Sequence, residues 1–248
     1  MNNQQQFQEE IKSNIQKLSS KSFKDLSIDF IANTAKANYT YNFSWLGRPI
    51  IQLPQDIIAL QEIIWDVKPD MIIETGIAHG GSLIFSASML TLLESCGEIE
   101  NGKVLGIDID IRVHNKKAIE AHPMSKKITM FQGSSIDESM IAKVKEFAQK
   151  GKKIMVILDS NHTHDHVLAE LKVYAHLASV GSYCCVFDTI IEDMPKGSFS
   201  NRPWDTGNNP KTAVWEYLKE CDDFVIDKDI ENKILITVAP DGYLKRIK

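Results

Sequence analysis

From residue 71 onward, short apolar runs alternate with segments in which apolar residues recur every three or four positions. The first pattern predicts buried strands and the second predicts amphipathic helices. The predicted strands are Met71–Glu74, Lys103–Asp108, Ile128–Gln132, Lys153–Asp159 and Ser182–Phe187. The predicted helices between them are Ser82–Leu93, Val113–Ala121, Asp137–Gln149 and His164–Leu177. Strands separated by helices indicate a mainly parallel sheet that is covered on both faces.

After a long loop, the spacing predicts one more helix over Lys211–Glu220. The last two apolar runs, Phe224–Asp227 and Lys233–Val238, are separated only by Lys228–Asn232, which is too short for a crossover between parallel strands. We therefore expect these runs to pair antiparallel, with Tyr243–Ile247 extending the last one. The predicted fold is a Rossmann-like, doubly wound α/β sheet of seven strands with an antiparallel C-terminal strand.

The segment before this alternation is different. Residues 1 to 37 show helical spacing, and Ser22 is the expected cap of a second helix. An aromatic, irregular segment follows, and Pro54 indicates the start of the helix that continues through Ile57–Val67. We expect residues 1–55 to form an N-terminal helical extension with an aromatic lid segment, and residues 56–248 to form the main domain.

The composition limits the class of protein. The 248 residues are 43% hydrophobic and 25% charged, which fits one large globular domain. A net charge of −5 argues against nucleic-acid binding. No apolar run reaches the ~18 residues of a membrane span, and the polar start lacks the apolar core of a signal peptide. The four cysteines show no C-x-x-C spacing, so we expect a reduced, cytoplasmic protein.

The stretch Met71–Ser82 is the first candidate site, because an apolar strand ends in an acid and a turn of small residues. Gly76 and Gly80 permit a tight turn and the close approach of a ligand. Glu74 lies at the strand end, and the spacing E-x-G-x-x-x-G-G differs from the G-x-G-x-x-G of dinucleotide sites. An acid at this position suits the ammonium and sulfonium of S-adenosylmethionine (SAM). Glu74, Gly76, Gly80 and Ser82 are therefore predicted cofactor contacts.

The next two strand ends extend this pocket. Asp108, with Asp110 close behind, lies where a carboxylate could accept hydrogen bonds from ribose hydroxyls. Gly133 and Ser134 follow the third strand and could line the pocket along the edge of the adenine ring. An NAD-dependent oxidoreductase is an alternative that fits the parallel sheet and Asp108 but not the glycine spacing.

Carboxylates also end the fourth and fifth strands. Asp159 and Asp188 should meet at the same edge of the sheet, and Glu192 lies four residues further on. Oxygen ligands of this kind suit Mg²⁺, whose remaining positions are filled by water and substrate. Asp159, Asp188 and Glu192 are the predicted metal ligands, and Asp159 also faces the cofactor.

Three histidines, His162, His164 and His166, follow Asp159 closely. A zinc site is one interpretation, but residues at this spacing do not all face one way. We expect His162 to act with Asp159 in catalysis, as the base that takes a hydroxyl proton. The alternative for His162 is a loop-capping role.

Aromatic side chains flank the predicted site and suit the faces of sugar or polyketide rings. Tyr41 and Trp45 come from the aromatic segment and Trp204 from the loop Asp188–Asn209. We include His164 as a fourth substrate candidate, with a solvent-facing helix start as its alternative. Packing under a long loop is the alternative for the aromatic residues.

Four segments together resemble the cephalosporin hydroxylase family, which includes relatives of the macrocin and rhamnosyl O-methyltransferases. The segments are Trp45–Asp56, Ile73–Ser82, Gly106–Asp110 and Leu158–Val167. The resemblance implies a class I methyltransferase fold that uses SAM and Mg²⁺ and methylates a hydroxyl of a sugar or glycosylated metabolite. It implies that Gln52 contacts the cofactor.

The resemblance also assigns Asp159 as a metal ligand and His162 as the catalytic histidine. The family's Glu-Asp pair after the fifth strand reads Phe187-Asp188 here. Either Glu192 or Asp193 replaces the missing glutamate, or the metal has fewer protein ligands. A SAM-binding accessory protein without catalysis is therefore a further alternative. The expected partners are a small-molecule or glycan acceptor and, through the N-terminal helices, a second copy of the chain.

Overall fold

The computed structural model describes residues 3–248, and within this range seven strands form one sheet in the order β5-β4-β3-β6-β7-β9-β8. The parallel strands are β3 (Met71–Thr75), β4 (Lys103–Asp108), β5 (Ile128–Gln132), β6 (Ile154–Leu158) and β7 (Tyr183–Val186). β9 (Tyr243–Arg246) lies antiparallel between β7 and β8 (Phe224–Ile226). The predicted fold class, with seven strands and an antiparallel C-terminal strand, is confirmed.

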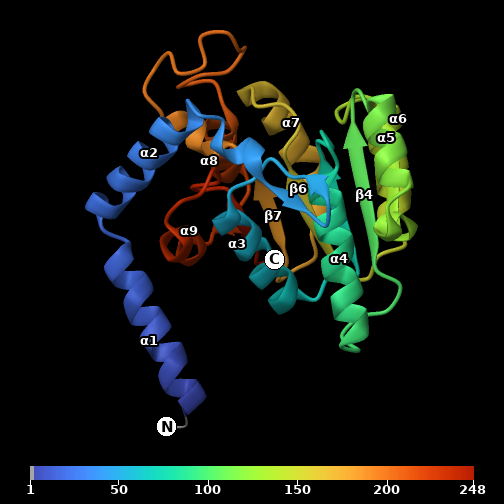
Figure 1. The fold of residues 1–248 in the computed structure, drawn as a ribbon, viewed down its shortest axis with the longest axis horizontal. Coiled ribbons are helices and arrows are strands. Elements are labelled where there is room, and N and C mark those ends of the chain that lie inside the picture. The colour runs from blue at the N-terminus through green and yellow to red at the C-terminus, as the bar shows by residue number, and fades with distance from the viewer. Residues whose placement is uncertain (1–2) are drawn as a thin grey trace.

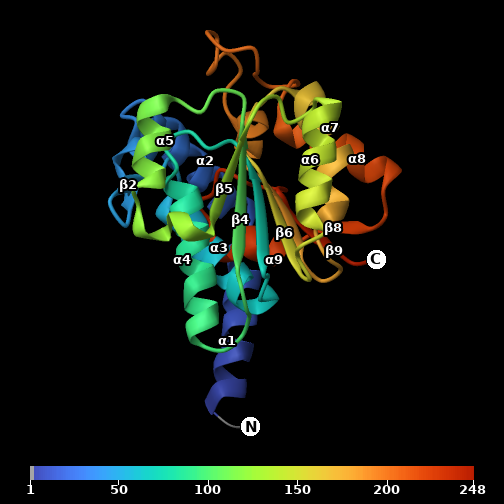
Figure 2. The same cartoon turned by 90° about the vertical axis from the view of Figure 1, so that its right-hand side faces the viewer.

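Helices cover both faces of this sheet, as Figure 2 shows. One face carries α3 (Pro54–Val67), α4 (Gly81–Ser95) and α5 (Val113–Glu120); the other carries α6 (Glu138–Ala148), α7 (His164–Tyr174) and α8 (Pro210–Glu220). Every residue of β3 and β6 is buried, as continuous apolar runs require. The sheet thus divides the interior into two apolar layers.

The strand order reverses between β3 and β6, because β4 and β5 follow on one side and β6 and β7 on the other. Ligands of open α/β sheets bind beyond the carboxyl ends of the strands at such a reversal. Three short 3₁₀ segments, η2 (Pro123–Lys127), η3 (Ala175–Leu177) and η4 (Thr189–Asp193), connect the later elements.

One predicted strand is wrong. Lys233–Val238 does not extend, because a short helix, α9 (Lys228–Ile234), occupies its first part. The Asp227 side chain caps this helix by accepting a hydrogen bond from the backbone N–H of Asp229 at 3.2 Å. The apolar residues that follow α9 pack toward α2 instead of joining the sheet. The strand that pairs antiparallel is Tyr243–Arg246 alone.

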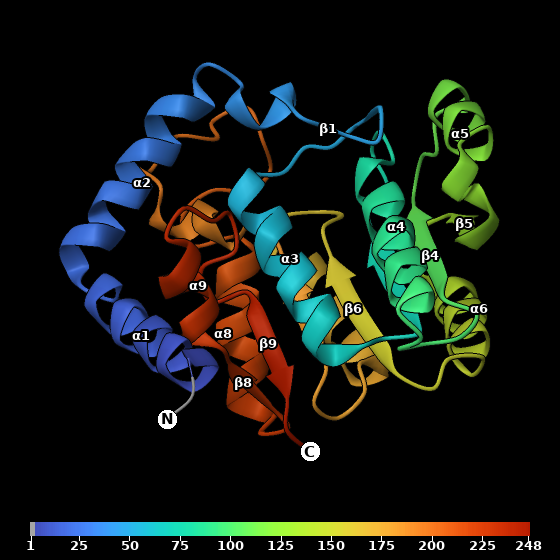
Figure 3. The same ribbon diagram turned by 60° about the horizontal axis from the view of Figure 1, so that its bottom comes forward.

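The N-terminal segment forms α1 (Asn3–Leu18) and α2 (Lys21–Ala35), then η1 (Tyr39–Asn42) and a small hairpin of β1 (Ser44–Trp45) and β2 (Arg48–Pro49). Figures 1 and 3 show α1 reaching away from the body beside α9, while α2 leads to the hairpin. The cap before α2 is Ser20 and not Ser22, which lies inside the helix. None of the helices within residues 3–248 is long and apolar enough to cross a membrane.

Candidate active site

The turn after β3 brings backbone from two strands into contact. Gly76 has φ +90, and a side chain there would collide with the backbone carbonyl of Asp159 at the end of β6. Gly80, with φ +83, caps α4, and a side chain there would meet Ile119. These are the left-handed conformations that favour glycine. The two glycines therefore let β6 and α5 pack closely against this turn, which lies at the reversal of strand order.

Glu74, one residue before the end of β3, is 1% exposed. The hydroxyl of Ser82 donates to its Oε1, while its Oε2 has no hydrogen-bond partner among the described residues. Burial raises the pKa of Glu74 to about 8, because desolvation disfavours the charged form. The Oε1 atom of Gln52 is likewise buried and unpaired in the described part of the chain. A donor from a ligand at this turn would satisfy both of these buried acceptors.

Asp108 ends β4 with its side chain turned to the same pocket. Its Oδ2 accepts hydrogen bonds from the backbone N–H groups of Ile77 at 2.8 Å and Ala78 at 3.2 Å. Gly133 and Ser134 lie beside it in a small pocket of about 140 Å³. Asp110 instead points outward, with its Oδ2 3.9 Å from Nε of Arg112. The structure thus brings Asp108, Gly133 and Ser134 together and leaves Asp110 outside.

Asp159, His162 and Asp188 form a tight group whose ligand atoms all lie within 4.8 Å of one another. The Nε2 atom of His162 is 3.2 Å from Oδ2 of Asp188. Burial, followed by repulsion from Asp188 and Glu74, raises the pKa of Asp159 well above its usual range. Two carboxylates and an imidazole converging in this way can hold a divalent cation, which would relieve the repulsion.

The structure places Glu192, the predicted third metal ligand, outside this group. Its Oε2 accepts hydrogen bonds from the backbone N–H of Gly207 at 2.7 Å and from Nδ2 of Asn209 at 2.5 Å. Asp193, the other substitute considered, pairs with Nζ of Lys211 at 2.5 Å. Both acids therefore brace the long loop, and His162 takes the third place in the group.

A cavity of about 380 Å³ opens in front of this group. Tyr41, Phe187 and Phe199 contribute aromatic walls, and Asp159 and His162 lie at its inner end. The Trp204 ring meets the His162 ring edge-on, with centroids 4.7 Å apart. The structure therefore places Tyr41 and Trp204 at the predicted acceptor side.

Two predicted substrate contacts lie elsewhere. The indole N–H of Trp45 donates to Oγ of Ser88 at 2.9 Å, and its ring packs on Phe85, so this side chain fastens the hairpin to α4. His164 contacts α8, with Nδ1 2.8 Å from Oγ1 of Thr212 and Nε2 3.2 Å from Glu216. His164 therefore links α7 to α8 and does not face solvent, as its alternative role would require.

A buried polar cluster beneath the Asp108 pocket was not predicted. Glu170 is fully buried, and its Oε1 accepts from the hydroxyls of Ser135 at 2.6 Å and Ser160 at 2.8 Å. His166 lies 3.4 Å from the same carboxylate and lines the pocket. The i, i+4 spacing of His166 and Glu170 on one predicted helix was the available signal.

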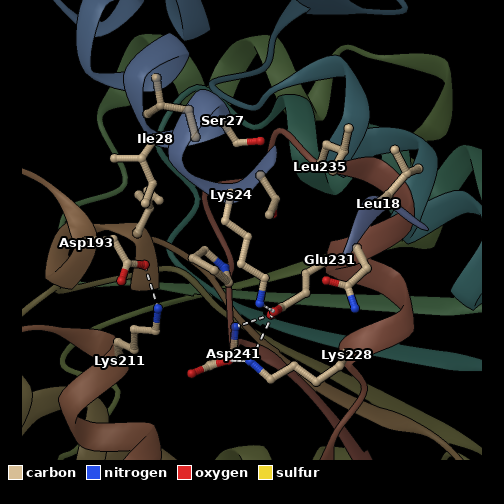
Figure 4. A pocket seen from close by; sticks show the side chains of 15 residues that line it. Leu18, Lys24, Ser27, Ile28, Asp193, Lys211, Lys228, Glu231, Leu235 and Asp241 are labelled. Carbon is tan, nitrogen blue, oxygen red and sulfur yellow. Dashed lines mark hydrogen bonds and ion pairs between the residues drawn. The ribbon is translucent and has the colours of Figure 1, made fainter. Parts of the chain in front are cut away.

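Figure 4 shows a second cavity, of about 260 Å³, between α2 and α9. Lys211 pairs there with Asp193, and Lys228 lies 3.0 Å from Glu231. Two residues line both cavities: Ile31 and Ile190. Since these lysines are paired with acids of this chain, we place the reaction in the cavity in front of Asp159, His162 and Asp188.

Comparisons with known proteins agree with this geometry. The family model described as Rhamnosyl O-methyltransferase/CmcI matches residues 37–247. A rhamnosyl O-methyltransferase of Mycobacterium tuberculosis is 31% identical over 195 residues, covering 77% of this chain and 73% of that protein. The Mycobacterium leprae protein of the same name is 27% identical over 212 residues, covering 84% and 86%.

Solved structures show the same fold. An apo-structure of CmcI aligns with a TM-score of 0.58 at 20% identity, covering 84% of this chain and 77% of that one. CmcI with Mg and SAM aligns with a TM-score of 0.56 at 20% identity, covering 84% and 78%.

Proposed function

Because the chain belongs to the Rhamnosyl O-methyltransferase/CmcI family, we propose that it transfers the methyl group of SAM to a hydroxyl of a sugar or glycosylated metabolite with the help of Mg²⁺. The observation that carries the proposal is the unpaired, buried Oε2 of Glu74 at the glycine turn, next to the group of Asp159, His162 and Asp188. A cytoplasmic location, a homo-oligomer and the division at residue 55 stay predictions of the sequence.

The cofactor pocket fits SAM group by group. An ammonium would supply the missing donor to Glu74 and would favour its charged form. Asp108 retains lone pairs for ribose hydroxyls, and Gly133 and Ser134 lie where an adenine edge would reach. Gly76 lets the turn after β3 pack against the backbone of Asp159, which brings the cofactor pocket and the cation site together. A pyrophosphate carries only acceptor oxygens, so it would supply no donor to Glu74 and would be repelled by the ionised carboxylate.

Asp159 and Asp188 would hold the cation, with His162 beside them. SAM supplies an electrophilic methyl group when bound, and the cation lowers the pKa of the acceptor hydroxyl. Phe187, which is 1% exposed, offers no oxygen, so the cation would have two protein carboxylates here. Mg²⁺ held by one or two carboxylates usually keeps several waters, so two protein carboxylates would suffice.

His162 is the group that moves a proton. If its Nε2–H is donated to Asp188, Nδ1 carries the lone pair that accepts the hydroxyl proton. The edge-on contact with Trp204 restrains the imidazole ring and keeps bulk water from that side. The acceptor oxygen is then oriented between His162 and the methyl group, and orientation contributes as much as proton removal.

Calorimetric titration with SAM, in Mg²⁺ and again in EDTA, tests the proposal, followed by transfer of a labelled methyl group to a panel of glycosides. We expect SAM to bind in both media, a separate Mg²⁺ heat, and methylation of at least one glycoside that EDTA suppresses. Failure to bind SAM would overturn the proposal. SAM binding without a Mg²⁺ heat and without transfer would favour the accessory protein, the second candidate, which the loss of a carboxylate at Phe187 supports.

A further inference from the structure

A second group of metal-ligating side chains lies outside the active site. His176, Cys221 and Asp223 each present one ligand atom, and these atoms lie within 4.8 Å of one another. The Nε2 atom of His176 is 2.9 Å from Oδ2 of Asp223 and 3.8 Å from Sγ of Cys221. These separations are close to the edges of a tetrahedron around a zinc-sized ion, for metal–ligand bonds of roughly 2.0 to 2.3 Å.

The backbone holds the three ligands in place. Cys221 follows the end of α8 in an extended conformation (φ −134, ψ 116), so Cys221 and Asp223 project toward the same side. The carbonyl of His176 accepts a hydrogen bond from Nη1 of Arg246 at 2.8 Å, which ties η3 to β9. The ligands therefore come from two segments that are fixed independently against the sheet.

The second ring nitrogen of His176 also has a partner. Its Nδ1 lies 3.3 Å from the hydroxyl of Tyr217, and the imidazole packs edge-on against Phe224 with centroids 5.4 Å apart. Metal-binding histidines commonly have such a partner, because it fixes the tautomer and leaves the other nitrogen free for the metal. Here Tyr217 would leave Nε2 for the ion.

We propose that His176, Cys221 and Asp223 form a binding site for Zn²⁺ or a similar borderline metal, distinct from the active-site group. A thiolate, an imidazole and a carboxylate together suit Zn²⁺ and Co²⁺ rather than Mg²⁺. The His176 and Asp223 side chains are 44% and 32% exposed, so water can reach the fourth position. The site precedes β7 and β8, at the edge of the sheet opposite the cofactor pocket.

The bound ion would join three parts of the fold: η3, the end of α8 and the start of β8. Binding would therefore stabilise the folded chain by an amount that grows with the logarithm of the metal concentration relative to the dissociation constant. Lys248, whose ammonium pairs with Asp222 at 2.5 Å, is the nearby cation that would oppose binding, so neutralising Lys248 should tighten it.

Titration of the reduced full-length protein with Co²⁺ tests the site, because a thiolate ligand gives a charge-transfer absorption that the oxygen and nitrogen ligands of the active site cannot give. We expect one equivalent of Co²⁺ to develop this band and Zn²⁺ to displace it. Cys221→Ser should abolish the band, whereas Cys96→Ser, which removes an exposed cysteine elsewhere, should leave it unchanged.

Two more variants separate ligands from neighbours. Asp159→Asn should retain the band, and Tyr217→Phe should weaken Co²⁺ affinity by ~10–100-fold while keeping the spectrum. The thermal unfolding midpoint of the wild type should rise with Zn²⁺, and that of Cys221→Ser should not. A missing band in the wild type, or a band that survives Cys221→Ser, would overturn the proposal.

Discussion

The two halves of the active site are built differently. On the cofactor half, Glu74, Gly76 and Asp108 lie within a few residues of buried strands, and backbone contacts fix them. On the acceptor half, the walls come from η1 and the loop after η4, which meet only through the tertiary fold. The local sequence therefore predicts the residues of the cofactor half well. Contacts on the acceptor half depend on segments that are far apart in the chain.

The difference has a chemical counterpart. The cofactor half presents single buried acceptors, whereas the acceptor half combines aromatic walls with the group of Asp159, His162 and Asp188 at its inner end. The cofactor half is therefore selective for one ligand, whereas the acceptor half can accommodate several ring-shaped acceptors. Substitutions on each half should accordingly affect different kinetic constants.

The largest effect should come from Asp159, where the two halves meet. Asp159→Asn removes a carboxylate from the cation site, and we expect kcat to fall by about 10⁴-fold, equivalent to several kcal/mol. Its thermal midpoint should not fall, since a buried carboxylate repelled by Asp188 is lost. Turnover assays with excess Mg²⁺ measure the first quantity; near-normal turnover would place the cation elsewhere.

His162→Ala should lower kcat by about 10²–10³-fold, because it removes the proton acceptor. SAM affinity, measured by calorimetry, should be unchanged, since His162 lies on the acceptor half. His164→Ala is the matched control: it removes a nearby imidazole that binds α8 and should leave turnover almost intact. Equal losses in both variants would assign His162 a structural role.

Glu74→Gln should weaken SAM binding by about 10–100-fold, the value of a hydrogen bond to a charged group. Wild-type affinity should rise with pH, by up to about tenfold per pH unit, until the pKa of about 8 is passed, because only the ionised carboxyl attracts the ammonium. The Glu74→Gln variant should show little of this dependence. Parallel pH profiles in the two proteins would contradict the assignment.

The same group affects stability in the opposite sense. The folded pKa of Glu74 lies above its ordinary value of 4.5, so its stabilising effect is complete below pH 4.5 and is lost as the pH rises through about 8. Without SAM, Glu74→Gln should therefore gain thermal stability over the wild type across this interval. Unfolding midpoints at several pH values provide the measurement, with Glu192→Gln as a control carboxyl on the loop.

The smallest expected effects concern two tryptophans, Trp204 and Trp45, which should change different quantities. Trp204→Ala should raise the KM for the acceptor by about 3–10-fold, as expected for the loss of one aromatic contact. Trp45→Ala should instead lower stability by about 2 kcal/mol, below the cost for a fully buried tryptophan, because its ring packs on Phe85. A KM change in the Trp45 variant alone would reverse these roles.

The sequence could predict the features that depend on short-range pattern. These are the parallel strands, their alternation with helices, the glycine turn and the acids at the strand ends. Glu192, Trp45 and His164 were assigned from proximity along the chain, and each is engaged by a distant partner: the loop at Gly207, Ser88 on α4 and Thr212 on α8. Periodicity also could not distinguish a strand over Lys233–Val238 from the turn after α9. These contacts depend on how separate helices and loops pack together, and the spacing of residues along the sequence does not determine that packing.

Asp188 illustrates how selection could act on this fold. Its backbone has φ 56, a left-handed conformation that glycine adopts more readily than aspartate, and its carboxylate repels that of Asp159. A library selected only for heat resistance should therefore replace Asp188 with glycine and lose the carboxylate, whereas selection for turnover should retain it. The position would report which of the two pressures a population has experienced.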